Sequence, residues 1–167
     1  MRLSAFANLP DDVPVWLFGF EKPLSANDKA HIGGIFDAFL QGWKSHGAPV
    51  NGDYEILHDR FVAVSGQSHD GLSGCSIDSC VANFKALKSR FGLDGLNRNF
   101  VFYRDCRGTV QSVNRLAFQK KLDSGEITPQ TPVFDTTVAT LGQLRSGALE
   151  STVEQCWHAK AFRVPVS

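Results

Sequence analysis

The residues whose types and spacing could do chemistry gather around one cysteine of this 167-residue chain. Cys75 lies in the segment Ser73 to Ser79 (SGCSIDS), where an amphipathic stretch begins. The first turn of a helix has unpaired backbone N–H groups and the positive end of the helix dipole, and both favour an anion. That anion would be the Cys75 thiolate, or else a phosphate, sulfate or carboxylate held by Ser73, Gly74, Ser76 and Asp78 as candidate ligand-binding residues.

The same segment also fits a helix start that binds nothing. Ser73 or Ser76 would then be the N-cap, Asp78 a favourable acid in the first turn, and Cys75 a small residue in a tight turn. Asp78 argues against a reactive thiolate, because a nearby negative charge raises the pKa of a thiol. The ligand, thiolate and helix-cap interpretations therefore remain open at this stage.

Two residues outside the segment are candidates to act with Cys75. His46 comes three residues after Trp43, at the expected end of the preceding helix, where it would accept the thiol proton as a catalytic base. Its alternative role is to bond the last carbonyls of that helix. Arg104, at the end of a later strand, would hold an anionic group beside them.

Composition excludes several classes of protein. Seventeen Lys and Arg balance seventeen Asp and Glu, so no nucleic-acid partner is expected. The four cysteines form no Cys-x-x-Cys pair, which argues against a structural zinc site, and no cofactor is expected. No signal-peptide pattern and no apolar stretch of the ~20 residues needed for a membrane span occur, so we expect a cytoplasmic protein with no membrane partner.

The elements that must position these residues follow the order strand, helix, strand, strand, helix, strand. Apolar spacing and turn residues place them at 13–20, 25–46, 54–57, 61–65, 77–91 and 99–104. This order predicts an α+β fold with a ferredoxin-like core (β-α-β-β-α-β) over about residues 12–106. In that fold His46, Cys75 and Arg104 meet at one edge of the sheet, and His58 lies at the opposite edge.

The last third of the chain is predicted to be a C-terminal α/β extension. Its expected elements are a strand at 109–113, a helix at 115–124, a short strand at 133–134 and a short helix at 138–144. Residues 107–167 contain too few apolar side chains to fold alone. We therefore expect one domain, 1–167, in which the extension packs on the core.

Three patterns resemble a family of small bacterial proteins of unknown function. They are Trp43-x-x-His46-Gly47, the SGCSIDS segment, and the Trp157-His158 pair. Some members carry a transporter-ATPase label, but this chain has no Walker motif, so no ATP binding is inferred. The resemblance implies a bacterial cytoplasmic protein and assigns no activity to any residue.

Three functions are compatible with these patterns. The first is a module that binds a small anionic ligand or a protein partner at Ser73 to Ser79 without catalysis. The second is a thiol-dependent enzyme or redox sensor that uses Cys75 and His46. The third is a structural or assembly module whose sheet pairs with a second copy in a homodimer. The first is the leading expectation.

Overall fold

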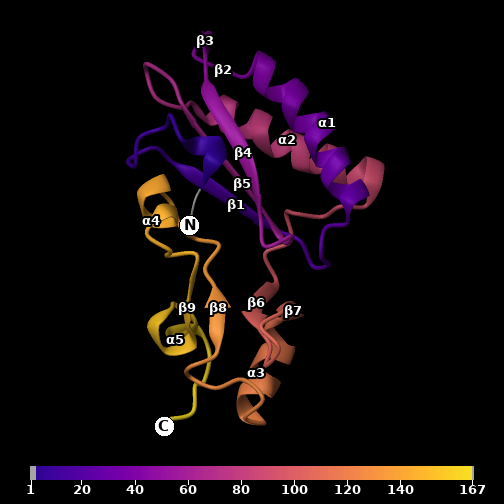
Figure 1. Ribbon diagram of the computed structural model, residues 1–167, viewed down its shortest axis with the longest axis vertical. Coiled ribbons are helices and arrows are strands. Elements are labelled where there is room, and N and C mark those ends of the chain that lie inside the picture. The colour runs from indigo at the N-terminus through magenta and orange to yellow at the C-terminus, as the bar shows by residue number, and fades with distance from the viewer. Residues whose placement is uncertain (1–2, 167) are drawn as a thin grey trace.

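The computed structural model describes residues 3–166 and contains two main antiparallel sheets (Figure 1). The first has the strand order β1-β5-β4 and the second the order β7-β6-β8-β9. Helices α1 and α2 pack against each other on one face of the first sheet, and α3 and α5 accompany the second. The strands of the first sheet are β1 (Val15–Gly19), β4 (Asn51–Leu57) and β5 (Phe61–Gln67), and those of the second are β6 (Phe100–Arg104), β7 (Val110–Asn114), β8 (Pro132–Phe134) and β9 (Glu150–Thr152).

The other elements connect or cover these sheets. The α-helices are α1 (Ala26–Gly42), α2 (Gly74–Phe91), α3 (Arg115–Asp123), α4 (Leu141–Arg145) and α5 (His158–Ala161). A small hairpin, β2 (Lys44–Ser45) with β3 (Ala48–Pro49), follows α1, and the 3-10 turns are η1 (Ser4–Phe6) and η2 (Val153–Gln155). The elements expected in the last third of the chain are confirmed as β7, α3, β8 and α4.

The α+β class is confirmed, but the expected fourth strand of the first sheet lies elsewhere. β6 forms a hairpin with β7 and pairs with β8, so the prediction that it would complete a ferredoxin-like sheet beside β1 is wrong. Part of the outer edge of β1 is taken by the segment before α4. There Val15 N–H donates to Ala139 O and Leu141 N–H donates to Val13 O, both at 3.0 Å. Residues 139–141 and not β6 therefore pair with the outer edge of β1. No local sequence pattern predicts which of these segments takes the edge.

Helix α1 begins where expected and ends earlier. Ser25 and Asp28 form a reciprocal capping box at its start. The helix stops at Gly42, so the prediction that it runs to His46 is wrong. Trp43 leaves the helix because its indole is buried against β4 and β5, where a Cβ on Gly52 or Gly66 would lie 2.6 or 2.8 Å from the ring.

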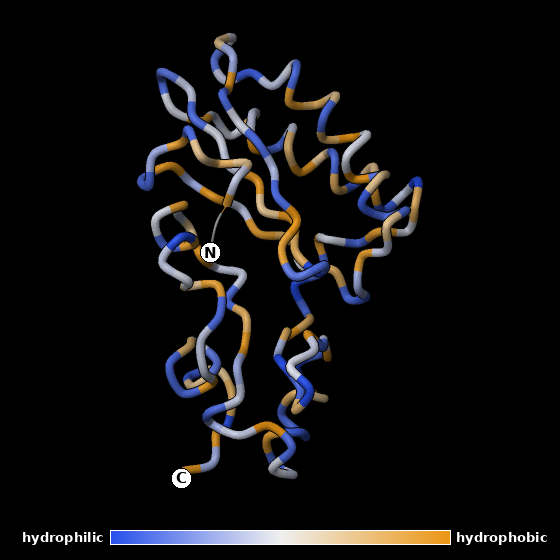
Figure 2. Tube along the Cα trace, viewed as in Figure 1, coloured by the Kyte–Doolittle hydropathy of each residue, from blue (hydrophilic) through white to orange (hydrophobic). Residues whose placement is uncertain are grey.

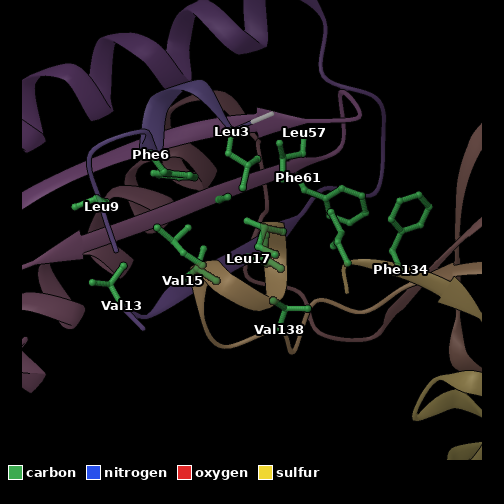
Figure 3. Close-up of a cluster of buried hydrophobic side chains, with 14 of the residues drawn as sticks. Leu3, Phe6, Leu9, Val13, Val15, Leu17, Leu57, Phe61, Phe134 and Val138 are labelled. Carbon is green, nitrogen blue, oxygen red and sulfur yellow. The ribbon is translucent and has the colours of Figure 1, made fainter. Parts of the chain in front are cut away.

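Three clusters of buried side chains hold the fold together, and one of them joins the two sheets. The first fills the space between α1, α2 and the first sheet, and the second lies between α3 and the second sheet. The third cluster contains Phe6, Leu17 and Phe61 from one side and Phe134 and Val138 from the other (Figure 3). Apolar residues recur along α1 and α2 in the spacing of a helix with one buried face (Figure 2). The C-terminal third thus packs on the first sheet through a shared core.

Gly19, at the end of β1, is a point of close approach between the sheets. A Cβ at this position would lie 2.6 Å from ring atoms of Phe102, a side chain in the shared core. We expect Gly19→Ala to lower the free energy of unfolding by about 1–3 kcal/mol, because the ring and the backbone must move apart. Urea denaturation measures the effect. The control is Gly34→Ala in α1, where no atom lies within 4 Å of the new methyl group.

This control is expected to leave stability unchanged or to raise it by up to about 1 kcal/mol, since alanine is the better helix former. Equal unfolding free energies for the two alanine variants would contradict the close packing of Gly19 on Phe102.

Candidate functional site

Helix α2 begins in the predicted segment, with its serines bonded inside the protein, but Asp78 lies beyond the first turn, so the prediction of a first-turn acid at Asp78 is wrong. Ser73 is the N-cap, and its Oγ accepts from Ser76 N–H at 3.1 Å. Ser76 is buried and donates its hydroxyl to Ser73 O at 2.6 Å. Ser45 Oγ accepts from Ser73 N–H at 2.8 Å and donates to Gly71 O at 2.9 Å. Gly74 lies on the exposed side of this turn. Most polar groups of the segment therefore already have protein partners.

The Ser45–Ser73 hydrogen bond brings the β2–β3 hairpin to the start of α2, so the segments of His46 and Cys75 adjoin each other. His46 lies in the turn of that hairpin with a φ of 50°, not on α1. Cys75, His46 and Asp78 are exposed. Among residues 3–166, no hydrogen bond joins His46 to Cys75. The structure therefore places the expected pair in one region without a proton-transfer contact.

Arg104 belongs to a different region, and its predicted place beside Cys75 is wrong because β6 lies in the second sheet. Its Nη2 donates to Glu150 Oε2 at 2.8 Å and lies 3.4 Å from His58 Nδ1. The hydrogen bond to Glu150 raises the pKa of Arg104 and neutralises its charge locally. His58, expected at the opposite edge from Cys75, packs against Phe134 with ring centroids 5.3 Å apart.

The cysteines differ in accessibility, which predicts their order of alkylation. Cys75 and Cys106 are exposed, whereas Cys80 is 2 % exposed and burial raises the pKa of its thiol to about 12. We expect iodoacetamide to modify Cys75 and Cys106 in the native protein and Cys80 only after unfolding. Mass spectrometry of peptides from timed, quenched reactions gives the three rates. Alkylation of Cys80 in the folded protein as fast as that of Cys75 would contradict the burial.

A cavity of about 250 Å³ between the two sheets has stronger features of a binding site. We call it the inter-sheet cleft. Its apolar lining comes from Gly19 at the end of β1 and from Phe100 and Phe102 of β6. Its polar and aromatic lining residues come from separate parts of the chain and are Asn97, Arg98, Arg115, Thr136, Thr137 and Trp157.

Among residues 3–166, Arg98 and Arg115 are the only charged residues that line the inter-sheet cleft. Neither forms an ion pair with a carboxylate of residues 3–166. Arg98 Nη1 donates to Leu17 O at 3.3 Å, and the Arg115 guanidinium lies over the Trp157 ring at 5.6 Å. Two positive charges without a neutralising partner in one hollow favour a bound anion.

The neutral side chains at the rim add hydrogen-bond donors. Asn97 Oδ1 accepts from Asn99 N–H at 2.9 Å, which leaves the Asn97 amide NH₂ to donate. Asp135 holds the neighbouring loop, since its Oδ1 accepts from Thr137 N–H at 2.8 Å and from Thr137 Oγ1 at 2.5 Å. The loop thereby keeps Thr136, the other threonine of the lining, in place.

An aromatic group at the start of α5 supports the cleft from behind Trp157. The rings of Trp157 and His158 stack with centroids 3.9 Å apart. His158 is fully buried, and neither of its ring nitrogens has a hydrogen-bond partner among the described residues; the same holds for Trp157 Nε1. Burial lowers the pKa of His158 to about 4, so this imidazole is neutral at pH 7.

Sequence reasoning missed the two arginines of the cleft. Arg98 lies in the connection after α2 and Arg115 is the first residue of α3, so no spacing relates them. Only the resemblance to a bacterial family, of which the Trp157-His158 pair is one pattern, drew attention to Trp157 and His158. The cleft exists only because the two sheets bring these segments together.

No protein-family model, no curated protein and no solved structure matches the chain, so the resemblance to a bacterial family stays a prediction. Within residues 3–166, no helix has the length and apolar character needed to cross a bilayer. The same residues contain no group of three or more His, Cys, Asp or Glu side chains arranged to hold a metal ion.

Proposed function

We propose that this protein is a binding module for a small anionic ligand, with the inter-sheet cleft as its binding site. The observation that supports this is that Arg98 and Arg115 are the only charged residues of the cleft and have no carboxylate partner among the residues described. The proposal keeps the ligand class expected from the sequence. It moves the site from Ser73–Ser79 to the cleft.

The chemistry of the lining suits a carboxylate or phosphate group. A guanidinium presents parallel N–H donors that match two oxygens of either group. Phe100, Phe102 and Trp157 give the cleft aromatic surface beside the two arginines, which are both exposed to solvent. The cavity volume of about 250 Å³ suits a small ligand or the end of a larger one.

Two tryptophans report separately on the two candidate sites. Trp157 lines the cleft, whereas Trp43 Nε1 donates to Ser76 O in the first turn of α2 at 3.0 Å. In a titration with inorganic phosphate or succinate, followed by ¹H–¹⁵N NMR of the indole groups, we expect the Trp157 signal to shift saturably and the Trp43 signal to stay. A shift confined to Trp43 would place the ligand at the α2 start and contradict the proposal.

Removal of either cleft arginine is expected to weaken that binding about tenfold or more, because a hydrogen bond to a charged group contributes about 1.5–3 kcal/mol and each 1.4 kcal/mol is tenfold in affinity. The variants are Arg98→Ala and Arg115→Ala, measured by the same titration. Arg107→Ala is the matched control, since it removes the same charge at an exposed position between β6 and β7. An equal loss in the control would show a general charge effect and no specific site.

A further inference from the structure

The last part of the chain, residues 157–166, forms a strap that contributes to the wall of the inter-sheet cleft. The strap contains α5 and the chain after it, and its first residue, Trp157, lines the cleft. The Arg115 guanidinium lies over two rings of the strap, 5.6 Å from the centroid of Trp157 and 5.0 Å from that of Phe162. The docked strap therefore completes the cleft and positions one of its two arginines.

A small number of contacts hold the end of the strap on α3. Phe162 packs on Phe118 with ring centroids 4.8 Å apart. Gln119 binds the strap backbone twice, because its Nε2 donates to Arg163 O at 3.0 Å and its Oε1 accepts from Arg163 N–H at 2.9 Å. The ion pair of Arg163 with Asp123, at 3.6 Å, is exposed. Terminal segments held in this way open without unfolding of the core.

The buried anchor of the strap is His158, which is 0 % exposed. Its ring stacks on Trp157 and lies 5.7 Å from the ring of Phe118, and neither of its nitrogens has a hydrogen-bond partner within residues 3–166. A protonated imidazole has two N–H donors and a positive charge, which both require water or an acceptor. The docked strap therefore favours an uncharged His158.

Charged and titratable groups of the neighbouring elements face His158. Arg115 of α3 repels a charged imidazole, and Asp135, in the loop after β8, attracts it. The Cys156 thiol lies beside the backbone N–H of His158, and burial raises the pKa of this thiol, which keeps it neutral. Burial of the imidazole outweighs the attraction of Asp135 and lowers the pKa of His158 to about 4 in the docked strap.

We propose that the strap is a pH-controlled gate, which opens and releases the bound anion when acid protonates His158. This inference rests on the proposed function, because it describes the regulation of the same cleft. In the open strap His158 is solvated and takes up a proton at its ordinary pKa of about 6.5. Protonation therefore favours the open strap, which withdraws Trp157 from the cleft and leaves Arg115 without the two rings that position it.

The two pKa values of His158 set the direction and size of the effect. The docked strap binds fewer protons than the open one, so docking is favoured above pH 6.5 and is lost as the pH falls toward 4. The ratio of open to docked strap increases about 60-fold between pH 7 and pH 4.5. By linkage, an anion that binds only the docked form keeps the strap closed.

Amide hydrogen exchange of the full chain measures the opening of the strap without a ligand. The reporters are the amides of Lys160, Ala161 and Phe162, which donate to carbonyls within the strap, and amides of α2 report unfolding of the whole chain. After correction for the intrinsic pH dependence of exchange, we expect the strap amides to lose protection about tenfold or more from pH 7 to pH 4.5. In His158→Phe this loss should be absent. Equal protection of the strap and α2 would overturn the gate, because the strap would then open only with the whole chain.

The titration with inorganic phosphate, followed by the Trp157 indole signal, then tests the link to the cleft. Each dissociation constant is divided by that of His158→Phe at the same pH, which cancels the protonation of phosphate itself. We expect this ratio to rise at least about threefold from pH 7 to pH 4.5, as the strap becomes mostly open. His69→Gln, at a position whose side chain is 93 % exposed, is the control.

A second variant loosens the strap without a change in His158 or in the cleft. Gln119→Ala removes both hydrogen bonds to Arg163. We expect about tenfold more opening at each pH, which moves the loss of phosphate binding upward by about one pH unit.

Two outcomes would reject the gate and keep the proposed function. A Trp157 shift with phosphate at pH 7, together with a constant ratio down to pH 4.5, would show that protonation of His158 does not control the cleft. Loss of strap protection with the same constant ratio would show a strap that opens without releasing the anion. Absence of a Trp157 shift at pH 7 would reject the proposed function and the gating of its ligand together.

Discussion

Replacement of Arg60 by alanine is expected to lower the free energy of unfolding by about 3–5 kcal/mol, because several buried carbonyls lose their donor at once. Arg60 is 5 % exposed, and its guanidinium donates to Val110 O at 2.8 Å and to the carbonyls of Phe20 and Glu21. These partners lie after β1 and at the start of β7. One side chain therefore ties the first sheet to the second.

Guanidinium denaturation at pH 7 measures this effect, and Arg107→Ala is the matched control. Arg107 is exposed, so its alanine variant is expected to stay within about 0.5 kcal/mol of the native protein. Arg60→Lys should fall between the two, since a single ammonium cannot reach all three carbonyls. A loss below about 1 kcal/mol for Arg60→Ala would contradict the role of this residue in joining the sheets.

Acidification from pH 6.5 to pH 4 is expected to cost about 3 kcal/mol of stability through His158, whose pKa falls from 6.5 to about 4 on burial, at 1.36 kcal/mol per unit. In the unfolded chain His158 takes up a proton below pH 6.5, whereas the folded protein resists it until about pH 4. This contribution is therefore complete above pH 6.5 and is lost as the pH falls through this window. Desolvation of the buried ring is the largest cause of the lowered pKa; the attraction of Asp135 for the charged ring opposes it in part, and the repulsion from Arg115 adds a smaller lowering.

The variant His158→Phe separates this effect from general acid sensitivity. Neither ring nitrogen of His158 has a partner among residues 3–166, so an apolar ring of similar shape loses no hydrogen bond and avoids the desolvation of a polar one. We expect equal or higher stability at pH 7 and a flatter pH dependence between pH 6.5 and 4.

Urea denaturation at several pH values gives both quantities. His69→Gln is the control, because the His69 side chain is 93 % exposed. The remaining slope in His158→Phe is expected to reflect His58, whose pKa is also lowered by burial. An unchanged slope in His158→Phe would show that another group titrates on unfolding.

Local patterns in the sequence predicted most helices and strands. The caps at Ser25 and Ser73 and the left-handed Gly92 mark helix ends by interactions within a few residues. These features depend on neighbours along the chain, so the sequence contains all the information that they need.

The predictions that were wrong share a different physical cause, which is their dependence on long-range contacts. The end of α1 depends on the burial of Trp43 against Gly52 and Gly66, which are distant in sequence. The partner of β6 depends on which segment takes the edge of β1, and residues 139–141 take part of it. Such choices compare the free energies of alternative long-range pairings. No spacing in the chain reports that comparison, and Arg104 was consequently assigned to the wrong region.

The sequence by itself determined the α+β class and most of the elements, because each follows from local propensity and periodic burial. Only the tertiary structure decided that two arginines without carboxylate partners line the same cleft. Arg98, Arg115 and Trp157 come from three separate segments and line one cleft solely because two sheets pack around a shared core. Convergence of distant segments is a property of packing, which no single stretch of sequence contains.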